Sequence, residues 1–280
     1  MNRNDLFVGF TPAAHRGASR QYPENTLEAF RRSLEIMPLC MLELDVRKTL
    51  DGRAVVFHDP SLDPKTDGSG PVHDSTLSEI KKLDAGYGIT FDNGATYPFR
   101  DKGFRIATLE EILQTFPGAR MSVDIKDNDL NAAALAMSII NEHKAGDRVI
   151  IASFFTRVVR FVRKKYPNSI TSFSKRDIFV FYLLHKLGLA GLFSNPGAAM
   201  FVPEFAGAGI SEYQEESLYK GFRVVSLGFI RDAHHQGIPV LVWTINRAEN
   251  MRRLISWGAD GIISDYPDLL KQVMEDRGIL

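Results

Sequence analysis

Two histidines, two carboxylates and an arginine stand out as residues that can do chemistry: His15, Arg16, Glu43, Asp45 and His58. Glu43 and Asp45 are two residues apart, and a strand points alternate side chains the same way, so both carboxylates would face one side. Such a pair, when buried, needs a bound cation or a basic neighbour. Imidazoles titrate near neutral pH, so two of them beside a cation can act as base and acid. Cleavage of a phosphodiester requires neutralisation of charge, a base for the nucleophile and an acid for the leaving alkoxide.

Two further residues extend this set. Asp124 can supply a third oxygen ligand, and Lys126, two residues on, would point the same way along a strand. Ligation by oxygen alone favours Mg²⁺ or Ca²⁺ over Zn²⁺. Arg16 offers a planar fork that matches a pair of phosphate oxygens. The alternative that stays open is a buried carboxylate network bonded to Arg16 and Lys126 without metal.

Short apolar segments of strand length recur along the chain, several of them followed by helical patterns, which predicts parallel β/α units. The predicted fold is therefore α/β, a (β/α)8 TIM barrel. Nine segments qualify as strands: 12–15, 41–46, 54–58, 121–125, 149–153, 170–173, 200–203, 240–244 and 261–264. Since a barrel has eight strands, we expect either 170–173 or 200–203 to be a loop or an accessory strand.

The candidate residues fall on consecutive predicted strands. His15 ends the first strand and His58 ends the third, while Glu43 and Asp45 lie in the second. Asp124 lies in the fourth. Because the carboxyl ends of parallel barrel strands meet at one rim, we expect these side chains to form a single site.

Two helices have start signals. Asn25 is expected to cap a helix with Glu28 three residues later, and Thr108 and Glu111 have the spacing of a capping box. Between them, residues 60–107 are rich in Asp, Gly, Pro, Ser and Lys, too long for an ordinary βα loop. We therefore expect residues 1–280 to form one catalytic barrel domain with a small insertion after the third strand, walling the substrate cleft on the catalytic face.

Composition narrows the class of protein. Hydrophobic residues make up 44% and charged residues 24%, which indicates a globular chain. Thirty-four basic and thirty-four acidic side chains cancel, so no net charge attracts nucleic acid or an anionic membrane. The single cysteine, Cys40, excludes an intramolecular disulfide. No signal peptide and no bilayer-spanning stretch is evident, so we expect a cytoplasmic protein.

Six stretches resemble glycerophosphodiester phosphodiesterases. They cover nearly the whole chain in the right order, and the combination of HRG, PENT, ExD and HD is specific. The stretches are AHRGASRQYPENTLEAF at 14–30, LELDV at 42–46, VVFHDPSLDPKTDGSGPV at 55–72, TLEEIL at 108–113, VWTIN at 242–246 and GADGIISDYPD at 258–268.

The resemblance implies a barrel that hydrolyses glycerophosphodiesters to glycerol 3-phosphate and an alcohol with a bound divalent cation, Mg²⁺ or Ca²⁺. Position by position, it implies the following roles. The catalytic pair is His15 and His58, the metal ligands are Glu43, Asp45 and Asp124, the phosphate contacts are Arg16 and Lys126, and Trp243 belongs to the pocket wall. A core aromatic at a strand end is the alternative for Trp243.

The sequence departs from the family pattern at two positions. The fourth-strand motif is usually glutamate, one residue, then lysine, whereas here it carries Asp124, which is one methylene shorter. The metal must then lie closer to that strand or bind through a water. The stretch LDPKT replaces a common arginine-threonine pair, so any polar role there passes to Lys65 or is lost.

Residues 177–193 form an apolar stretch with no polar face through 178–184. We expect it either to be buried or, together with Phe193, Phe201 and Phe205, to form a lipid-facing lip over the rim and a peripheral membrane contact. Three functions follow: hydrolysis of soluble glycerophosphodiesters, lysophospholipase D-like hydrolysis at a membrane surface, or a non-catalytic phosphate-binding barrel. The sequence does not predict the oligomeric state.

Overall fold

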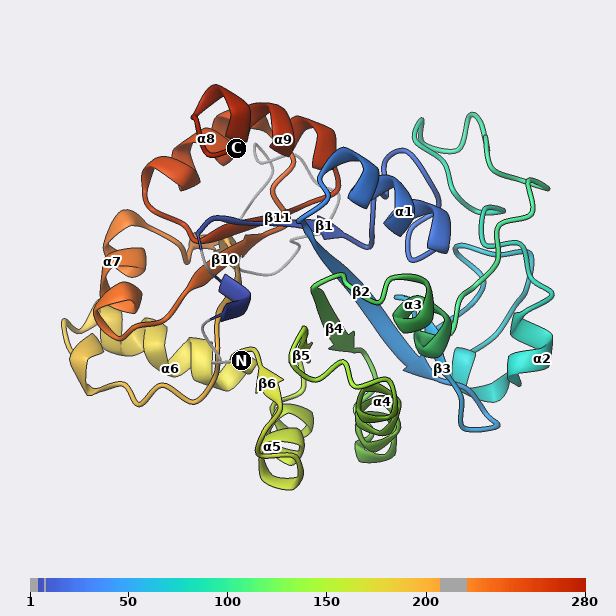
Figure 1. Ribbon diagram of the computed structural model, residues 1–280, viewed down its shortest axis with the longest axis horizontal. Coiled ribbons are helices and arrows are strands. Elements are labelled where there is room, and N and C mark those ends of the chain that lie inside the picture. The colour runs from blue at the N-terminus through green and yellow to red at the C-terminus, as the bar shows by residue number, and fades with distance from the viewer. Residues whose placement is uncertain (1–4, 8, 207–220) are drawn as a thin grey trace.

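A curled sheet of parallel strands forms the centre of the chain. The computed structural model describes residues 5–7, 9–206 and 221–280. Within them, eight parallel strands follow the order β6-β5-β4-β2-β1-β11-β10-β7, with helices around the outside (Figure 1). Their bounds are β1 Thr11–His15, β2 Met41–Lys48, β4 Met121–Ile125, β5 Val149–Ala152, β6 Ile170–Thr171, β7 Met200–Pro203, β10 Val240–Trp243 and β11 Gly261–Ser264. The predicted (β/α)8 TIM barrel is confirmed.

Strands β6 and β7 meet through a parallel bridge between Ser172 and Ala199. The Phe173 amide donates to the Ala199 carbonyl oxygen at 3.0 Å, which joins the two ends of the strand order. Both segments, 170–173 and 200–203, therefore contribute a strand to the barrel. The prediction that one of them is a loop or an accessory strand was wrong.

The surplus strand is β3, Ala54–Val56, which pairs antiparallel with β2. An apolar segment of this kind has the same side-chain pattern in either direction, so its sequence does not show which way it runs. Residues 57–108 therefore lie in the connection between β3 and α3. The 60–107 segment follows β3, which is not part of the parallel set.

Helices surround the strands. The α-helices are α1 Leu27–Ile36, α2 Leu77–Ile80, α3 Leu109–Thr115, α4 Leu130–Glu142, α5 Thr156–Lys165, α6 Lys175–Lys186, α7 Leu227–His235, α8 Ala248–Ser256 and α9 Pro267–Asp276. Short 3-10 helices are η1 Asp5–Phe7, η2 Val72–Asp74 and η3 Ala190–Leu192, and β8 Phe205–Ala206 pairs with β9 Phe222–Arg223. None of the described helices has both the length and the apolar character needed to cross a bilayer.

Alternation along β2 separates the core from the site. Leu42 and Leu44 pack outward against the helices, in the cluster that holds most of the core. Met41 belongs to a second cluster that fills the inside of the barrel. Because side chains alternate, Glu43 and Asp45 share the inner face with Met41, as the sequence predicted.

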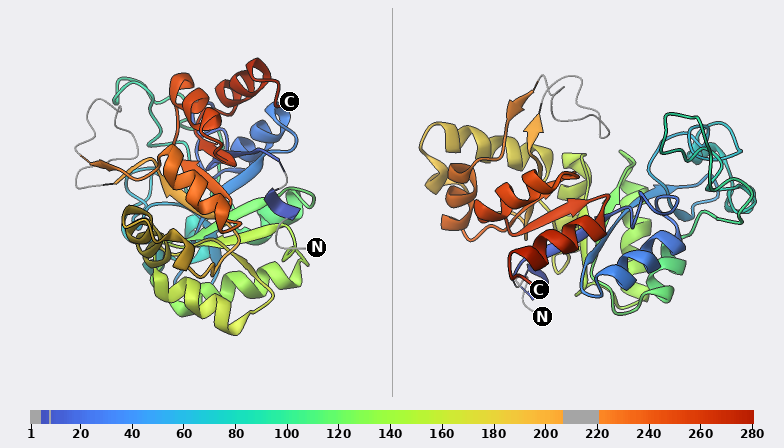
Figure 2. Two further views of the ribbon diagram at one scale, coloured as in Figure 1. Left: turned by 90° about the vertical axis from the view of Figure 1, so that its left-hand side faces the viewer. Right: turned by 90° about the horizontal axis from the view of Figure 1, so that it is seen from above.

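The segment between β3 and α3 packs around a small core of its own, built on Val55, Phe57, Ile80 and Ile106. It lies at the opposite end of the molecule from α6 in both Figure 1 and the right view of Figure 2. Thr108 starts α3 with the predicted capping box, in which its hydroxyl accepts from the Glu111 amide.

The cap of α1 differs from expectation. Thr26, not Asn25, is its N-cap, and the Thr26 hydroxyl accepts a hydrogen bond from the Ala29 amide. Asn25 has a positive φ of 60° and donates from its side chain to Asp45 instead. A residue that looks like a helix cap in sequence is therefore used to hold a site carboxylate.

Gly261 provides a test of the barrel's close packing. A Cβ at this position would lie 2.3 Å from the Thr11 carbonyl oxygen on the neighbouring strand. Overpacking of a rigid interior costs about 1–3 kcal/mol, so Gly261→Ala should lower the free energy of unfolding by that amount in urea denaturation. Gly118→Ala, where a Cβ meets nothing within 4 Å, is the matched control. Equal stability of the two variants would contradict this account of the β1–β11 contact.

Candidate active site

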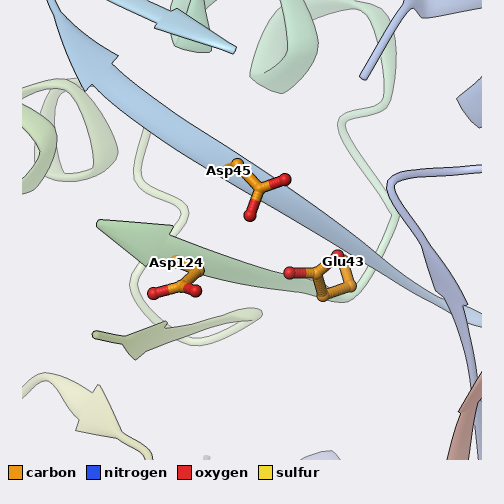
Figure 3. A group of neighbouring side chains, drawn as sticks. All are labelled: Glu43, Asp45 and Asp124. Atoms are coloured by element: carbon orange, nitrogen blue, oxygen red, sulfur yellow. The ribbon is translucent and has the colours of Figure 1, made fainter. Parts of the chain in front are cut away.

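Three carboxylates meet inside the barrel. Glu43 and Asp45 come from β2, and Asp124 comes from β4, where it lies directly opposite Asp45 in the strand register. One oxygen from each lies within 4.8 Å of the others (Figure 3). Asp45 is fully buried, and Glu43 and Asp124 are 7% and 8% exposed. The predicted grouping of these residues is confirmed.

Two cations partly neutralise this carboxylate cluster. The Lys126 ammonium lies 3.0 Å from an Asp45 oxygen and 2.8 Å from an Asp124 oxygen, and Arg16 Nε lies 3.2 Å from Asp45. Burial alone would raise the pKa of Asp45, but the charges of Lys126 and Arg16 lower it below its ordinary value. The contacts that the sequence left as the metal-free alternative are therefore present.

Glu43 bears what is left of the repulsion. Burial, and then the negative charge of Asp45, raise the pKa of Glu43 to about 7. The three carboxylates of the cluster face the two positive charges of Lys126 and Arg16, so the cluster has one negative charge more than these neighbours balance. A bound cation would remove this excess.

The donor set fits a divalent cation. The Oδ1 atom of Asp124 is buried without a hydrogen-bond partner among the described residues, although a buried carboxylate oxygen ordinarily has one. All three groups offer oxygen, the donor that hard divalent cations prefer. Glu43, Asp45 and Asp124 can therefore hold a metal ion. The shorter side chain of Asp124 does not remove it from the cluster.

A left-handed turn after β1 orients two of these carboxylates. Arg16 has a φ of 55°, and its backbone amide donates to Glu43 Oε2 at 3.0 Å. Asn25, whose own amide donates to the Arg16 carbonyl, donates from its side chain to Asp45 at 2.8 Å. The Arg16 guanidinium is 1% exposed and also contacts Glu24 at 3.1 Å. The fork predicted to bind phosphate is therefore occupied by carboxylates here.

His15 ends β1 and points toward the cluster. Its Nε2 atom lies 4.0 Å from Glu43 Oε2, and its Nδ1 atom lies 2.6 Å from Asp265 Oδ1. Burial and Arg16 oppose protonation, but the nearby charge of Asp265 and the hydrogen bond to it raise the pKa of His15 above its ordinary value. The imidazole thus has one edge on the carboxylate cluster and the other on Asp265.

His58 is held differently from the prediction. It lies two residues beyond β3, in a loop, because β3 ends at Val56. The Arg47 side chain donates to the His58 carbonyl oxygen at 2.8 Å, and the ring's Nδ1 lies 2.8 Å from Asp59. The charge of His58 contributes to the lowered pKa of Asp45. His58 lines a small pocket together with Glu24, Asn25 and Lys65.

A cleft of about 1000 Å³ opens beside the cluster. Its lining includes His15, Glu43, Asp124 and Lys126. Aromatic and aliphatic side chains line the rest, among them Phe154, Ile178, Phe179, Tyr182, Phe201, Phe222 and Trp243. Trp243 lies edge-on to Phe154, with ring centroids 5.7 Å apart, at the carboxyl end of β10. The cleft therefore has both charged and apolar lining residues.

Sequence reasoning missed three polar residues of the site. Asp265, Asn246 and Asn25 lie in the stretches SDYP, TIN and PENT, but only their resemblance to a family indicated any importance. Lys65 does have a polar contact, 3.4 Å from Glu24, which in turn contacts Arg16. The partners of Asp265, Asn246 and Asn25 are distant in sequence, so no local pattern indicated these three residues.

Comparison with known proteins shows the family of this chain. Residues 15–269 fit the Glycerophosphoryl diester phosphodiesterase family. The chain belongs to this family. A glycerophosphodiester phosphodiesterase from Caldanaerobacter subterraneus subsp. tengcongensis is 32% identical over 270 residues, covering 95% of this chain and 98% of the relative. One from Bacillus subtilis is 32% identical over 274 residues, covering 93% and 85%.

A solved structure shares the fold. The Oleispira antarctica phosphodiesterase, in complex with the product sn-glycerol-3-phosphate, has a TM-score of 0.73 and 24% identity, covering 95% of this chain and 97% of that one. As a member of this family, the chain is an enzyme of the phosphoric diester hydrolase class.

The ability of the cluster to hold a cation can be measured directly. Asp124→Asn removes one negative oxygen from the set and should weaken Mg²⁺ and Ca²⁺ binding in isothermal titration calorimetry by at least about tenfold, because changes around metal ligands typically cost 10–100-fold. Asp129→Asn is the control, since Asp129 caps α4 at the same rim and asparagine caps equally well. Unchanged affinity in the Asp124 variant would exclude this residue as a ligand.

Proposed function

We propose that this enzyme hydrolyses glycerophosphodiesters to glycerol 3-phosphate and an alcohol, with His15 and His58 as its acid-base pair. The observation that carries the proposal is the position of His15 Nε2, 4.0 Å from Glu43 and on the wall of the cleft. An imidazole there can exchange protons with a diester bound at the carboxylate cluster. The product bound to the Oleispira antarctica relative is consistent with this substrate class.

Glu43, Asp45 and Asp124 would hold the Mg²⁺ or Ca²⁺ ion, which when bound supplies positive charge to the phosphate and its developing negative charge. Lys126 lines the cleft beside them and provides a second positive charge toward the diester. Arg16, behind the cluster, acts on phosphate if its guanidinium exchanges a carboxylate for a phosphate oxygen. Trp243 forms part of the apolar wall that receives the alcohol.

In the reaction, an oxygen of water, or of the substrate's own glycerol hydroxyl by way of a cyclic phosphate, forms a bond to phosphorus. The bond between phosphorus and the alcohol oxygen breaks. One histidine takes the proton of the nucleophile, and the other gives a proton to the leaving alkoxide. We propose that residues 1–280 form a single catalytic domain and that the 60–107 segment forms a wall of the site. Lys65 of this segment contacts Glu24, and both line the small pocket with His58.

Removing either imidazole tests this function. His15→Ala and His58→Ala should each lower kcat for glycerophosphocholine by about 100- to 10,000-fold, the usual contribution of a positioned acid or base. The assay contains added Mg²⁺ or Ca²⁺. His73→Ala is the control, because His73 is 69% exposed in its side chain and lies in the 60–107 segment. Near wild-type turnover in both site variants would refute the proposed histidine pair.

A second candidate keeps the chemistry and changes the substrate to a lysophospholipid at a membrane surface. Helix α6 supports it, because only Phe181 of this helix is buried, while Phe179 is 59% exposed and also lines the cleft. Leu183 and Leu187 extend the exposed apolar face, and Lys175 and Lys186 stand at its ends. Such a face can contact lipid in the way of an interfacial helix.

Substrate comparison separates the two candidates. If the lipid candidate is right, the wild type hydrolyses lysophosphatidylcholine at least as well as glycerophosphocholine. Phe179→Ser should then lower the ratio of the two turnover rates about tenfold, because an acyl chain loses its apolar contact. Leu39→Ser, an exposed leucine outside the cleft, should leave the ratio unchanged. A strong wild-type preference for the deacylated substrate would remove the lipid candidate.

A further inference from the structure

Asp265 contacts His15 across 250 residues of sequence. The neighbouring strands β1 and β11 place Ala14 opposite Ser264, so the next residue of each strand end meets its counterpart. His15 Nδ1 and Asp265 Oδ1 are 2.6 Å apart, and Asp265 is only 5% exposed. A short contact in a buried place is a strong constraint on the ring.

Two other donors fix the Asp265 carboxylate. The Ser19 hydroxyl donates to Oδ1 at 3.0 Å, and the Asn246 amide donates to Oδ2 at 2.6 Å. Burial alone would raise the pKa of Asp265, but the charge of His15 and the hydrogen bonds from His15 and Asn246 lower it to about 2. The group is therefore an ionised carboxylate that accepts on both oxygens.

The orientation of Asn246 is itself determined. Its Oδ1 atom accepts from the Asp265 backbone amide at 3.0 Å and from the Ser264 hydroxyl at 3.2 Å. A backbone N–H can only donate, so the other end of the Asn246 side chain must be the NH₂ group that faces Asp265 Oδ2.

We propose that Asp265, oriented by Asn246 and Ser19, is a positioning residue that keeps the neutral His15 ring in the tautomer with its proton on Nδ1. A carboxylate has no proton to give, so the ring must donate from Nδ1, which leaves Nε2 bare on the side of Glu43 and the cleft. A bare Nε2 can accept a proton from the reacting groups. The catalytic importance of this tautomer rests on the proposed function, but the tautomer itself does not.

Asp265→Asn should reverse the tautomer. The fixed NH₂ of Asn246 requires the oxygen of the new amide to face it, which turns the new NH₂ toward His15 Nδ1. The Ser19 hydroxyl can rotate to accept and does not oppose the change. His15 would then carry its proton on Nε2, and kcat for glycerophosphocholine should fall about 100-fold or more with KM changed less than about threefold.

The double variant Asn246→Asp with Asp265→Asn provides a rescue. An aspartate at 246 still accepts from the 265 amide, but it now also accepts from the NH₂ of the new asparagine, so that the amide oxygen turns back to His15. We expect the Nδ1 tautomer to return and kcat to rise at least about tenfold above that of the single variant. Asp260→Asn is the control, because Asp260 makes the same kind of contact with His234, at 2.7 Å, on an exposed part of the barrel.

The tautomer is read by nitrogen NMR of histidine-labelled, metal-free protein at a pH where the rings are neutral. The His15 signal, one of seven histidines, is assigned from its loss in His15→Gln. An Nε2–H tautomer in the wild type would overturn the proposal without any variant, and so would an Nδ1–H tautomer in Asp265→Asn. Failure of the double variant to recover the tautomer would also overturn it. Absence of wild-type turnover would refute the proposed function but not these tautomer results.

Discussion

The repulsion among Glu43, Asp45 and Asp124 is the constraint on which the site depends. Two unit charges about 4 Å apart in a partly buried place repel by about 4 kcal/mol, and here three carboxylates lie within 4.8 Å. Lys126 and Arg16 offset part of this energy through contacts near 3 Å. Burial, together with the remaining repulsion from Asp45, raises the pKa of Glu43 to about 7. The barrel interior thus holds an arrangement that favours a bound cation over apolar packing.

The same constraint explains the backbone after β1. Arg16 and Asn25 both adopt a positive φ, which costs a residue other than glycine about 1–3 kcal/mol where the surroundings impose it. In return, the Arg16 backbone amide donates to Glu43 and the Asn25 side-chain amide donates to Asp45, so each β2 carboxylate has a neutral donor. Gly17 completes the turn, where a Cβ would lie 2.8 Å from Ala29 of α1. The cost of the positive φ angles is therefore offset by hydrogen bonds that orient the carboxylates of Glu43 and Asp45.

The sequence predicted what depends on periodicity and missed what depends on long-range contacts. The alternation of Glu43 and Asp45 around Leu44 correctly placed both carboxylates inside, because side-chain direction in a strand is a local property. The direction of β3 is not local, so the antiparallel pairing and the loop position of His58 were missed. Asn25 had the residue type and spacing of a cap, but Thr26 caps the helix and Asn25 serves Asp45. Asp265 contacts His15 only because β11 returns to β1.

Under the proposed function, chemistry and substrate choice depend on different parts of this barrel. The carboxylate cluster and His15 stand on strands whose positions are fixed by ladder hydrogen bonds and a close-packed core, so their geometry is difficult to alter. The apolar end of the cleft is built from α6, the β8–β9 pair and residues at strand ends, such as Phe179, Phe222 and Trp243. Under the proposed function, changes there would alter which alcohol fits without moving the reacting groups. Under the proposed function, a chain with no net charge would bind an anionic diester at the carboxylate cluster, while the apolar lining of the cleft selects the alcohol.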